Sequence, residues 1–162
     1  MRLSEEWNVF VDARKSVPVR VEDIPQKLGL EYKEVYLSNE ISGMIECTDL
    51  RFSIRINASD PKTRKRFTLA HELGHYMLHR HLIGDGLDDD RAYRSTEAGK
   101  YHNTHIGPRE ETEANRFAAS LLMPRDLIKR HRDDLHDDTE KMADLFQVSR
   151  QSMSIRLSIK YK

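Results

Sequence analysis

The chain has 162 residues, of which 38% are hydrophobic and 33% are charged, with 27 basic side chains against 27 acidic ones. This composition is too polar for a membrane protein and too apolar for a disordered one, and the balanced charge gives no bulk attraction to nucleic acid or to a membrane. The length suits one domain with a small helical appendix. Because the N-terminal segment lacks a signal-peptide pattern and Cys47 is the single cysteine, we expect a cytoplasmic protein.

The first part of the chain predicts two helices and then three strands. The helices are expected at residues 4–15 and 24–28, and the strands at residues 30–37, 41–47 and 51–57. Trp7, Phe10 and Val11 share one face of the first helix, and Pro25 stands in the first turn of the second. The third strand alternates apolar and polar side chains, the pattern of a sheet with one wet face. Cys47 is interpreted as a small buried hydrophobe.

Two longer helices follow, with an irregular segment between them. The first opens at Ser59–Pro61 and runs to about Leu82, and its apolar side chains cover most of its circumference, which predicts a buried middle. The second runs from about Arg109 to Met123 and is stopped by Pro124. Residues 83–108 have no period, as in functional or mobile loops, and the aspartates at 85 and 88–90 are interpreted as solvated charge.

The segment His71-Glu72-Leu73-Gly74-His75 lies in the middle of the predicted buried helix. Histidines at i and i+4 point from nearly one face, so both imidazoles can reach a single zinc ion. Glu72 lies beside them and can act on a water molecule as a general base without ligating the metal. The five residues therefore predict a metal centre, against the simpler interpretation of two buried structural histidines.

A catalytic zinc site needs a third protein ligand, and several side chains are candidates. His81 has the spacing of an extended motif, but Leu78 stands where that motif has its glycine; His79 lies too far along the helix axis. Carboxylates on the second long helix are better candidates, namely Glu110, Glu111 and Glu113. Glu111 shares a helical stripe with Asn115 and Ala118, whereas Glu113 falls on a face that we expect to be solvated.

Two blocks, Arg66–His75 and Glu111–Pro124, resemble the signature blocks of the ImmA/IrrE family of metallo-endopeptidases. The resemblance implies one zinc ion per chain held by His71, His75 and Glu111, with Glu72 as the catalytic glutamate. It implies an α+β, zincin-like core in which a small three-stranded antiparallel or mixed sheet packs on the two ligand helices. We expect residues 1–124 to form the metalloprotease domain and residues 125–162 to form a helix-turn-helix-like subdomain packed on it.

The expected reaction is metal-assisted peptide hydrolysis, in which Glu72 takes a proton from water and passes it to the leaving amine. Possible donors to the oxyanion are several histidines and tyrosines, among which the sequence does not choose: Tyr76, His79, His81, Tyr101, His102 and His105. Residues 83–107 are a candidate lid or a solvated loop. By analogy with strand addition, residues 51–57 are the candidate strand for pairing with an extended substrate.

The tail predicts a helix-turn-helix from Thr139–Phe146 and Ser149–Ile159, with four basic and no acidic side chains in residues 148–162. The acid-rich segment 132–144 just before it opposes phosphate binding. We therefore expect the tail to pack on the rest of the protein and not to bind DNA. The family resemblance implies a protein substrate, most often a helix-turn-helix repressor, in an anti-repressor or stress-response role. The alternative is a DNA-binding or partner-binding regulator, including a toxin–antitoxin component, whose metal site is sensory or vestigial.

Overall fold

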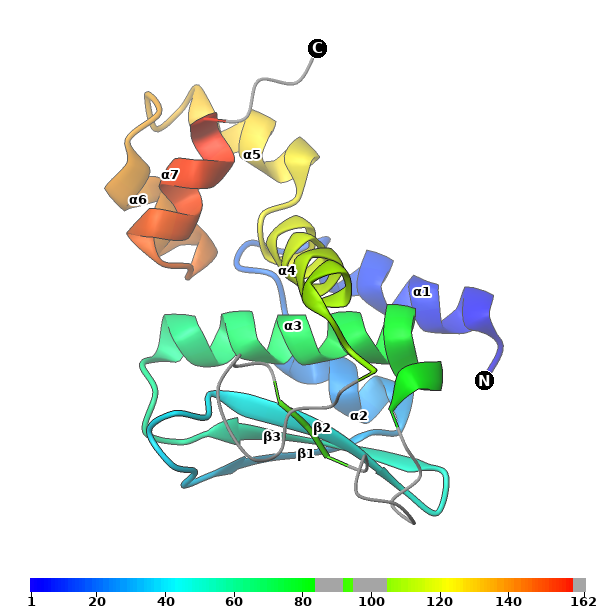
Figure 1. Cartoon of the computed structure of the whole chain (residues 1–162). Helices are drawn as coiled ribbons and strands as arrows, with labels where there is room; N and C mark the ends of the chain where they lie inside the picture. Colours follow the sequence, from blue (N-terminus) through cyan, green and yellow to red (C-terminus); the bar gives the residue numbers. More distant parts are fainter. Residues whose placement is uncertain (84–91, 95–104, 159–162) are drawn as a thin grey trace.

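The structure is a computed structural model that describes residues 1–83, 92–94 and 105–158 (Figure 1). Its helices are α1 (Leu3–Ala13), α2 (Ile24–Leu28), α3 (Lys62–His79), α4 (Pro108–Leu122), α5 (Arg125–Arg132), α6 (Thr139–Phe146) and α7 (Arg150–Ser158), with 3-10 turns η1 (Val21–Asp23) and η2 (Arg80–Leu82). Its strands are β1 (Glu31–Val35), β2 (Gly43–Thr48), β3 (Arg51–Asn57) and β4 (Ala92–Arg94). None of the helices in these ranges is long and apolar enough to cross a membrane.

The strands form one mixed sheet in the order β1-β3-β2-β4. β1 runs parallel to β3, and β2 runs antiparallel to both β3 and β4. The predicted α+β class with a small mixed sheet is therefore confirmed. The sequence did not reveal β4, because its three residues lie in the segment without periodicity and are held by pairing with a strand far away in the chain.

The prediction that residues 51–57 offer a free edge to a substrate is wrong. β3 lies inside the sheet, where it pairs with β1 from Ser53 to Asn57 and with β2 from Arg51 to Ile56. Its backbone donors and acceptors are thus used on both sides, and a further strand cannot be added there. The outer strands of the sheet are β1 and β4.

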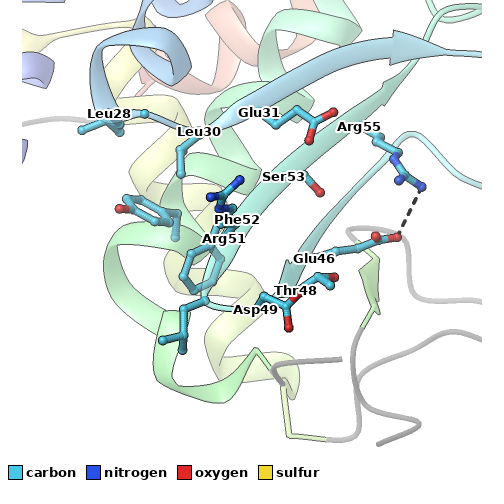
Figure 2. A pocket seen from close by; sticks show the side chains of 13 residues that line it. Leu28, Leu30, Glu31, Glu46, Thr48, Asp49, Arg51, Phe52, Ser53 and Arg55 are labelled. Carbon is cyan, nitrogen blue, oxygen red and sulfur yellow. Dashed lines mark ion pairs between the residues drawn. The ribbon is translucent and has the colours of Figure 1, made fainter. Parts of the chain in front are cut away.

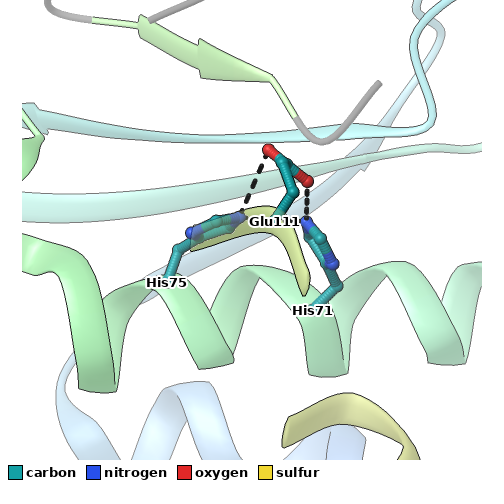
Figure 3. Close-up of side chains that lie close together, drawn as sticks. All are labelled: His71, His75 and Glu111. Atoms are coloured by element: carbon teal, nitrogen blue, oxygen red, sulfur yellow. Dashed lines mark hydrogen bonds and ion pairs between the residues drawn. The ribbon is translucent and has the colours of Figure 1, made fainter. Parts of the chain in front are cut away.

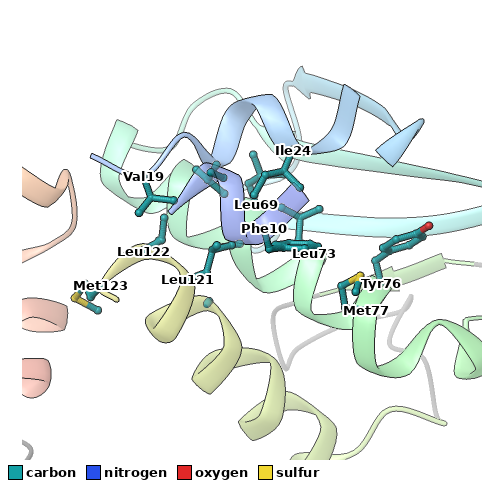
Figure 4. Close-up of a cluster of buried hydrophobic side chains, with 14 of the residues drawn as sticks. Phe10, Val19, Ile24, Leu69, Leu73, Tyr76, Met77, Leu121, Leu122 and Met123 are labelled. Carbon is teal, nitrogen blue, oxygen red and sulfur yellow. The ribbon is translucent and has the colours of Figure 1, made fainter. Parts of the chain in front are cut away.

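Helix α3 lies between the sheet and α4, and this explains its apolar circumference (Figure 1). Leu69 and Leu73 are buried in the core that α3 shares with the first helices and α4 (Figure 4). On the sheet side the approach is close: a Cβ atom on Gly43 of β2 would lie 2.5 Å from Thr68 Cγ2 and 2.9 Å from Ile56 Cδ1. Only glycine at position 43 therefore lets α3 settle at this distance from the sheet.

Asn57 connects the end of β3 to the loop before β2 and to the start of α3. Its side chain is buried, and its amide nitrogen donates to the carbonyl oxygens of Leu37, Ser38 and Ile41 at 3.3, 3.2 and 2.9 Å. Its Oδ1 atom accepts from the backbone N–H of Ser59 at 3.1 Å. One side chain thus satisfies several backbone groups that no strand partner reaches.

Arg66 joins α3 to the segment before α2 and to the turn between α6 and α7. Its buried guanidinium donates two hydrogen bonds of 2.7 and 2.8 Å to the Glu22 carboxylate and one of 2.9 Å to the Val19 carbonyl. It also donates to the carbonyl oxygen of Gln147, in the turn between α6 and α7, at 3.2 Å. The helical tail is therefore anchored on α3, while its status as a separate subdomain of residues 125–162 remains a prediction.

We predict that Asn57→Ala lowers the free energy of unfolding by about 2–4 kcal/mol, because it leaves several backbone groups without their partner. Denaturant unfolding of the metal-free protein measures the change. Asn57→Asp is the matched variant: it keeps the acceptor for Ser59 but cannot donate to the three carbonyls, so we expect it to be nearly as unstable. An unchanged midpoint for both variants would contradict the assigned role.

Candidate metal centre

Three side chains of α3 predicted to act at the site, His71, Glu72 and His75, are buried in its middle. The helical spacing points the two imidazoles to one side, so that His71 Nε2 and His75 Nε2 lie 3.0 Å apart. Glu72 is fully buried next to them, and its negative charge acts on His71. The helix therefore presents two ring nitrogens to a common point, with a carboxylate beside them.

Glu111 is the residue of α4 that meets both histidines (Figure 3). Its Oε2 lies 3.2 Å from His71 Nε2 and its Oε1 lies 3.7 Å from His75 Nε2. The three donor atoms fall within 4.8 Å of one another, and within the described ranges no other such group of His, Cys, Asp or Glu occurs. We refer to His71, His75 and Glu111 as the donor cluster.

A glycine allows α4 to come near enough for this contact. A Cβ atom on Gly74 would lie 3.2 Å from Ala114 Cα, 3.3 Å from the Ala114 carbonyl oxygen and 3.1 Å from Phe117 Cδ1. Two of these neighbours are backbone atoms, which cannot turn away as a flexible side chain can. Ala114 and Ala118 on the facing side of α4 are also fully buried. Small residues on both helices thus set the distance from Glu111 to the histidines.

Further hydrogen bonds hold the His71 and His75 rings at Nδ1, the nitrogen that faces away from Glu111. The Nδ1 atom of His71 lies 2.8 Å from Asn115 Oδ1, and since an amide oxygen only accepts, His71 carries its proton on Nδ1. The Nδ1 atom of His75 lies 3.0 Å from Nδ1 of His79, whose Nε2 in turn lies 2.8 Å from Glu113 Oε2.

The two histidines differ in protonation. Burial, followed by the electrostatic effect of the neighbouring His71 and His79 rings, lowers the pKa of His75 to about 2, so this ring is neutral. Burial acts in the same direction on His71, but the hydrogen bond to Glu111 and the charges of Glu72 and Glu111 outweigh it and raise the pKa of His71. Without a metal, His71 thus holds a proton more readily than an ordinary histidine does.

The donor cluster fits a divalent metal ion. Four-coordinate zinc has bonds of about 2.0–2.1 Å to nitrogen and oxygen, which places its ligand atoms roughly 3.3 Å apart. The two ring nitrogens lie 3.0 Å apart, and they lie 3.2 and 3.7 Å from different oxygens of the Glu111 carboxylate, distances close to this value. Two imidazoles and one carboxylate also form a common donor set for catalytic zinc, one that leaves a coordination position open.

The other predicted third ligands lie elsewhere. His81 is exposed in η2, and Glu110 accepts a 2.9 Å hydrogen bond from the backbone N–H of Gly107 at the start of α4. Glu113 is bonded to His79 and to Arg109 Nε, at 2.8 and 3.0 Å, and these two contacts, that of His79 first, hold the pKa of its carboxyl below the usual value. The prediction that Glu113 occupies a simple solvated face missed its contact with His79.

The candidate oxyanion donors are only partly placed. The Tyr76 hydroxyl donates to Glu6 Oε1 at 3.0 Å, and both ring nitrogens of His79 are in use. His105 is exposed. Tyr101, His102 and the aspartates at 85 and 88–90 lie outside the described residues, as does most of the candidate lid at 83–107. Cys47 is buried in β2, as predicted.

A large hollow of about 1010 Å³ lies on the sheet and not at the donor cluster (Figure 2). Its walls include Leu28, Glu46, Arg51, Phe52 and Arg55, and it holds an ion pair of 3.6 Å between Arg55 and Glu46. Tyr76 is its one lining residue from α3. No member of the donor cluster borders this hollow, so the two are separate features of the molecule.

A family model described as Peptidase_M78, IrrE N-terminal-like domain, matches residues 14–158. The chain belongs to this family. The resemblance to ImmA/IrrE proteins is thereby confirmed, and the family supports a metallopeptidase. No curated protein matches the sequence. A solved structure, a Mycobacterium tuberculosis transcriptional regulator, has a similar fold with a TM-score of 0.63 and 16% identity over 99% of this chain. The chain spans 47% of the length of that structure.

We predict that Gly74→Ala weakens zinc binding by about tenfold or more, because the added methyl group pushes α4 and Glu111 away from the histidines. Alanine also favours the helix by about 1 kcal/mol, so the metal-free protein need not lose stability. Titration with Zn²⁺ against a chromophoric chelator measures the affinity. Wild-type affinity in this variant would show that the contact between α3 and α4 does not control the cluster.

We predict that Zn²⁺ binding releases a proton. Because the pKa of His71 is raised, the metal-free cluster holds a proton that the ion must displace, so affinity rises with pH until the pH exceeds that raised pKa. His75 is already neutral and adds nothing. Titration calorimetry in two buffers of different ionisation enthalpy counts the protons, and an affinity independent of pH would refute this account.

Proposed function

We propose that this protein is a zinc-dependent endopeptidase that hydrolyses a peptide bond in a specific protein. The observation that carries the proposal is the buried donor cluster of His71, His75 and Glu111 with Glu72 beside it. Membership of a peptidase family supports it, since an intact His₂Glu set is what metal-assisted hydrolysis requires.

Each residue has a distinct role in this proposal. His71, His75 and Glu111 hold the ion, which supplies Lewis acidity that polarises the scissile carbonyl and makes water acidic. Glu72 accepts a proton from water on its carboxylate and delivers it to the leaving amine. Burial in the middle of α3 keeps Glu72 beside the donor cluster, where this role requires it.

The substrate we propose is a helix-turn-helix repressor. This rests on the family resemblance, and the similar fold of a transcriptional regulator fits an association with gene control. The second candidate is a DNA-binding regulator, favoured by α6 and α7 with a tight turn at Gln147, whose φ is 53°. Against it, the two cations of α7 are engaged: Arg150 pairs with Glu140, and Arg156 Nε donates to the Met123 carbonyl at 3.0 Å.

We predict that Glu72→Gln abolishes hydrolysis but retains zinc, whereas His75→Ala loses the metal. Glu72 acts on water and His75 on the ion, so elemental analysis separates the two roles. His75→Ala should also lose the stabilisation that zinc gives to the folded wild type. Equal loss of zinc in both variants would contradict this division of roles.

The proposed substrate is tested by incubating the zinc-loaded protein with a candidate repressor and, separately, with casein. We expect one or a few cuts in the repressor, none with Glu72→Gln, and little digestion of casein. Rapid digestion of casein would refute restricted specificity. Cleavage of neither, together with tight and specific binding to DNA at physiological salt, would favour the regulator instead.

A further inference from the structure

Behind the donor cluster, His75, His79 and Glu113 form a continuous chain of hydrogen bonds. His75 and His79 stand at i and i+4 on α3, so their rings are neighbours, with centroids 5.2 Å apart. The chain then crosses to α4, where the Glu113 carboxylate bonds His79 Nε2 at 2.8 Å through Oε2 and Arg109 Nε at 3.0 Å through Oε1. Both histidines are buried, so water does not compete for these ring nitrogens.

The direction of the hydrogen bonds follows from the chemistry of the groups. An ionised carboxylate only accepts, so Nε2 of His79 donates to Glu113. Nδ1 of His79 lies 3.0 Å from Nδ1 of His75, so a single hydrogen is shared between these two nitrogens. For His75 to turn an Nε2 lone pair toward the donor cluster, that hydrogen must be on His75 Nδ1, and His79 Nδ1 must accept it.

We propose that His79 and Glu113 are positioning residues that fix His75 in the tautomer and ring orientation needed to bind a metal ion. This inference rests on the proposed function. It makes His75 the counterpart of His71, whose Nδ1 is held by Asn115 at 2.8 Å. Two α4 side chains, Asn115 and Glu113, thus orient the two imidazole ligands, one directly and one through His79. Outer partners of this kind commonly change metal affinity 10–100-fold.

The test compares zinc affinities of His79→Leu and His79→Gln by chelator competition. Leucine cannot accept from His75, so we expect a 10–100-fold loss. Glutamine can accept from His75 and donate to Glu113, so we expect it to restore most of the affinity. Glu113→Ala should also weaken binding. The matched control is Glu110→Ala, which removes a carboxylate from the same turn of α4. Because Glu110 is bonded to the backbone N–H of Gly107 and not to His79, this variant should bind zinc as the wild type does.

A second measurement needs neither activity nor bound metal. Long-range ¹H–¹⁵N NMR spectra of the metal-free wild type should show the His75 hydrogen on Nδ1, and in His79→Leu a shift toward Nε2. If the wild-type protein binds no zinc, the proposed function fails. The tautomer of His75 in the metal-free protein still tests whether His79 and Glu113 position this ring. A hydrogen on Nε2 in the wild type, or wild-type zinc affinity in a folded His79→Leu variant, would overturn the proposal.

Discussion

The close contact between α3 and α4 is the constraint on which the donor cluster depends. Two histidines on one helix can meet at a point by helical geometry alone, but the carboxylate must come from a separate segment. Gly74 and Ala114 remove the side-chain volume that would hold the helices apart, and buried core residues on both helices hold them together. Packing that is complete before any ion binds leaves little ordering to be done on binding, and this favours affinity.

This arrangement has an energetic cost that the hydrogen bonds only partly offset. His71, Glu72, His75 and His79 occupy positions in a buried helix where apolar side chains would be more stable. The outer nitrogen of His71 is bonded by Asn115, and that of His75 by His79, which Glu113 holds in turn. The inner nitrogens of His71 and His75 face one another and Glu111. A metal ion at that point would satisfy them together and stabilise the folded state by an amount that grows with its affinity and concentration.

The sequence predicted what is local and periodic. Residues 51–57 and 139–146 are a strand and a helix with the expected bounds, and the spacing of His71 and His75 places them on one face as expected. It did not predict that β3 lies inside the sheet, because its parallel partner is chosen by tertiary packing. The position of His79 along the helix axis argues against it as a metal ligand, but does not reveal that its ring bonds the outer nitrogen of the ligand His75.

The tail is bound to α3 through Arg66, which lies five residues before His71. Because its guanidinium holds Glu22 and two backbone carbonyls at once, the segment before α2, the helix α3 and the turn at Gln147 are fixed together. That turn separates α6 from α7, and the Gln147 carbonyl is directed toward Arg66 of α3. Arg156 is also bonded inward, to the Met123 carbonyl at the end of α4, so this cation packs the tail on α4 and is not directed at phosphate.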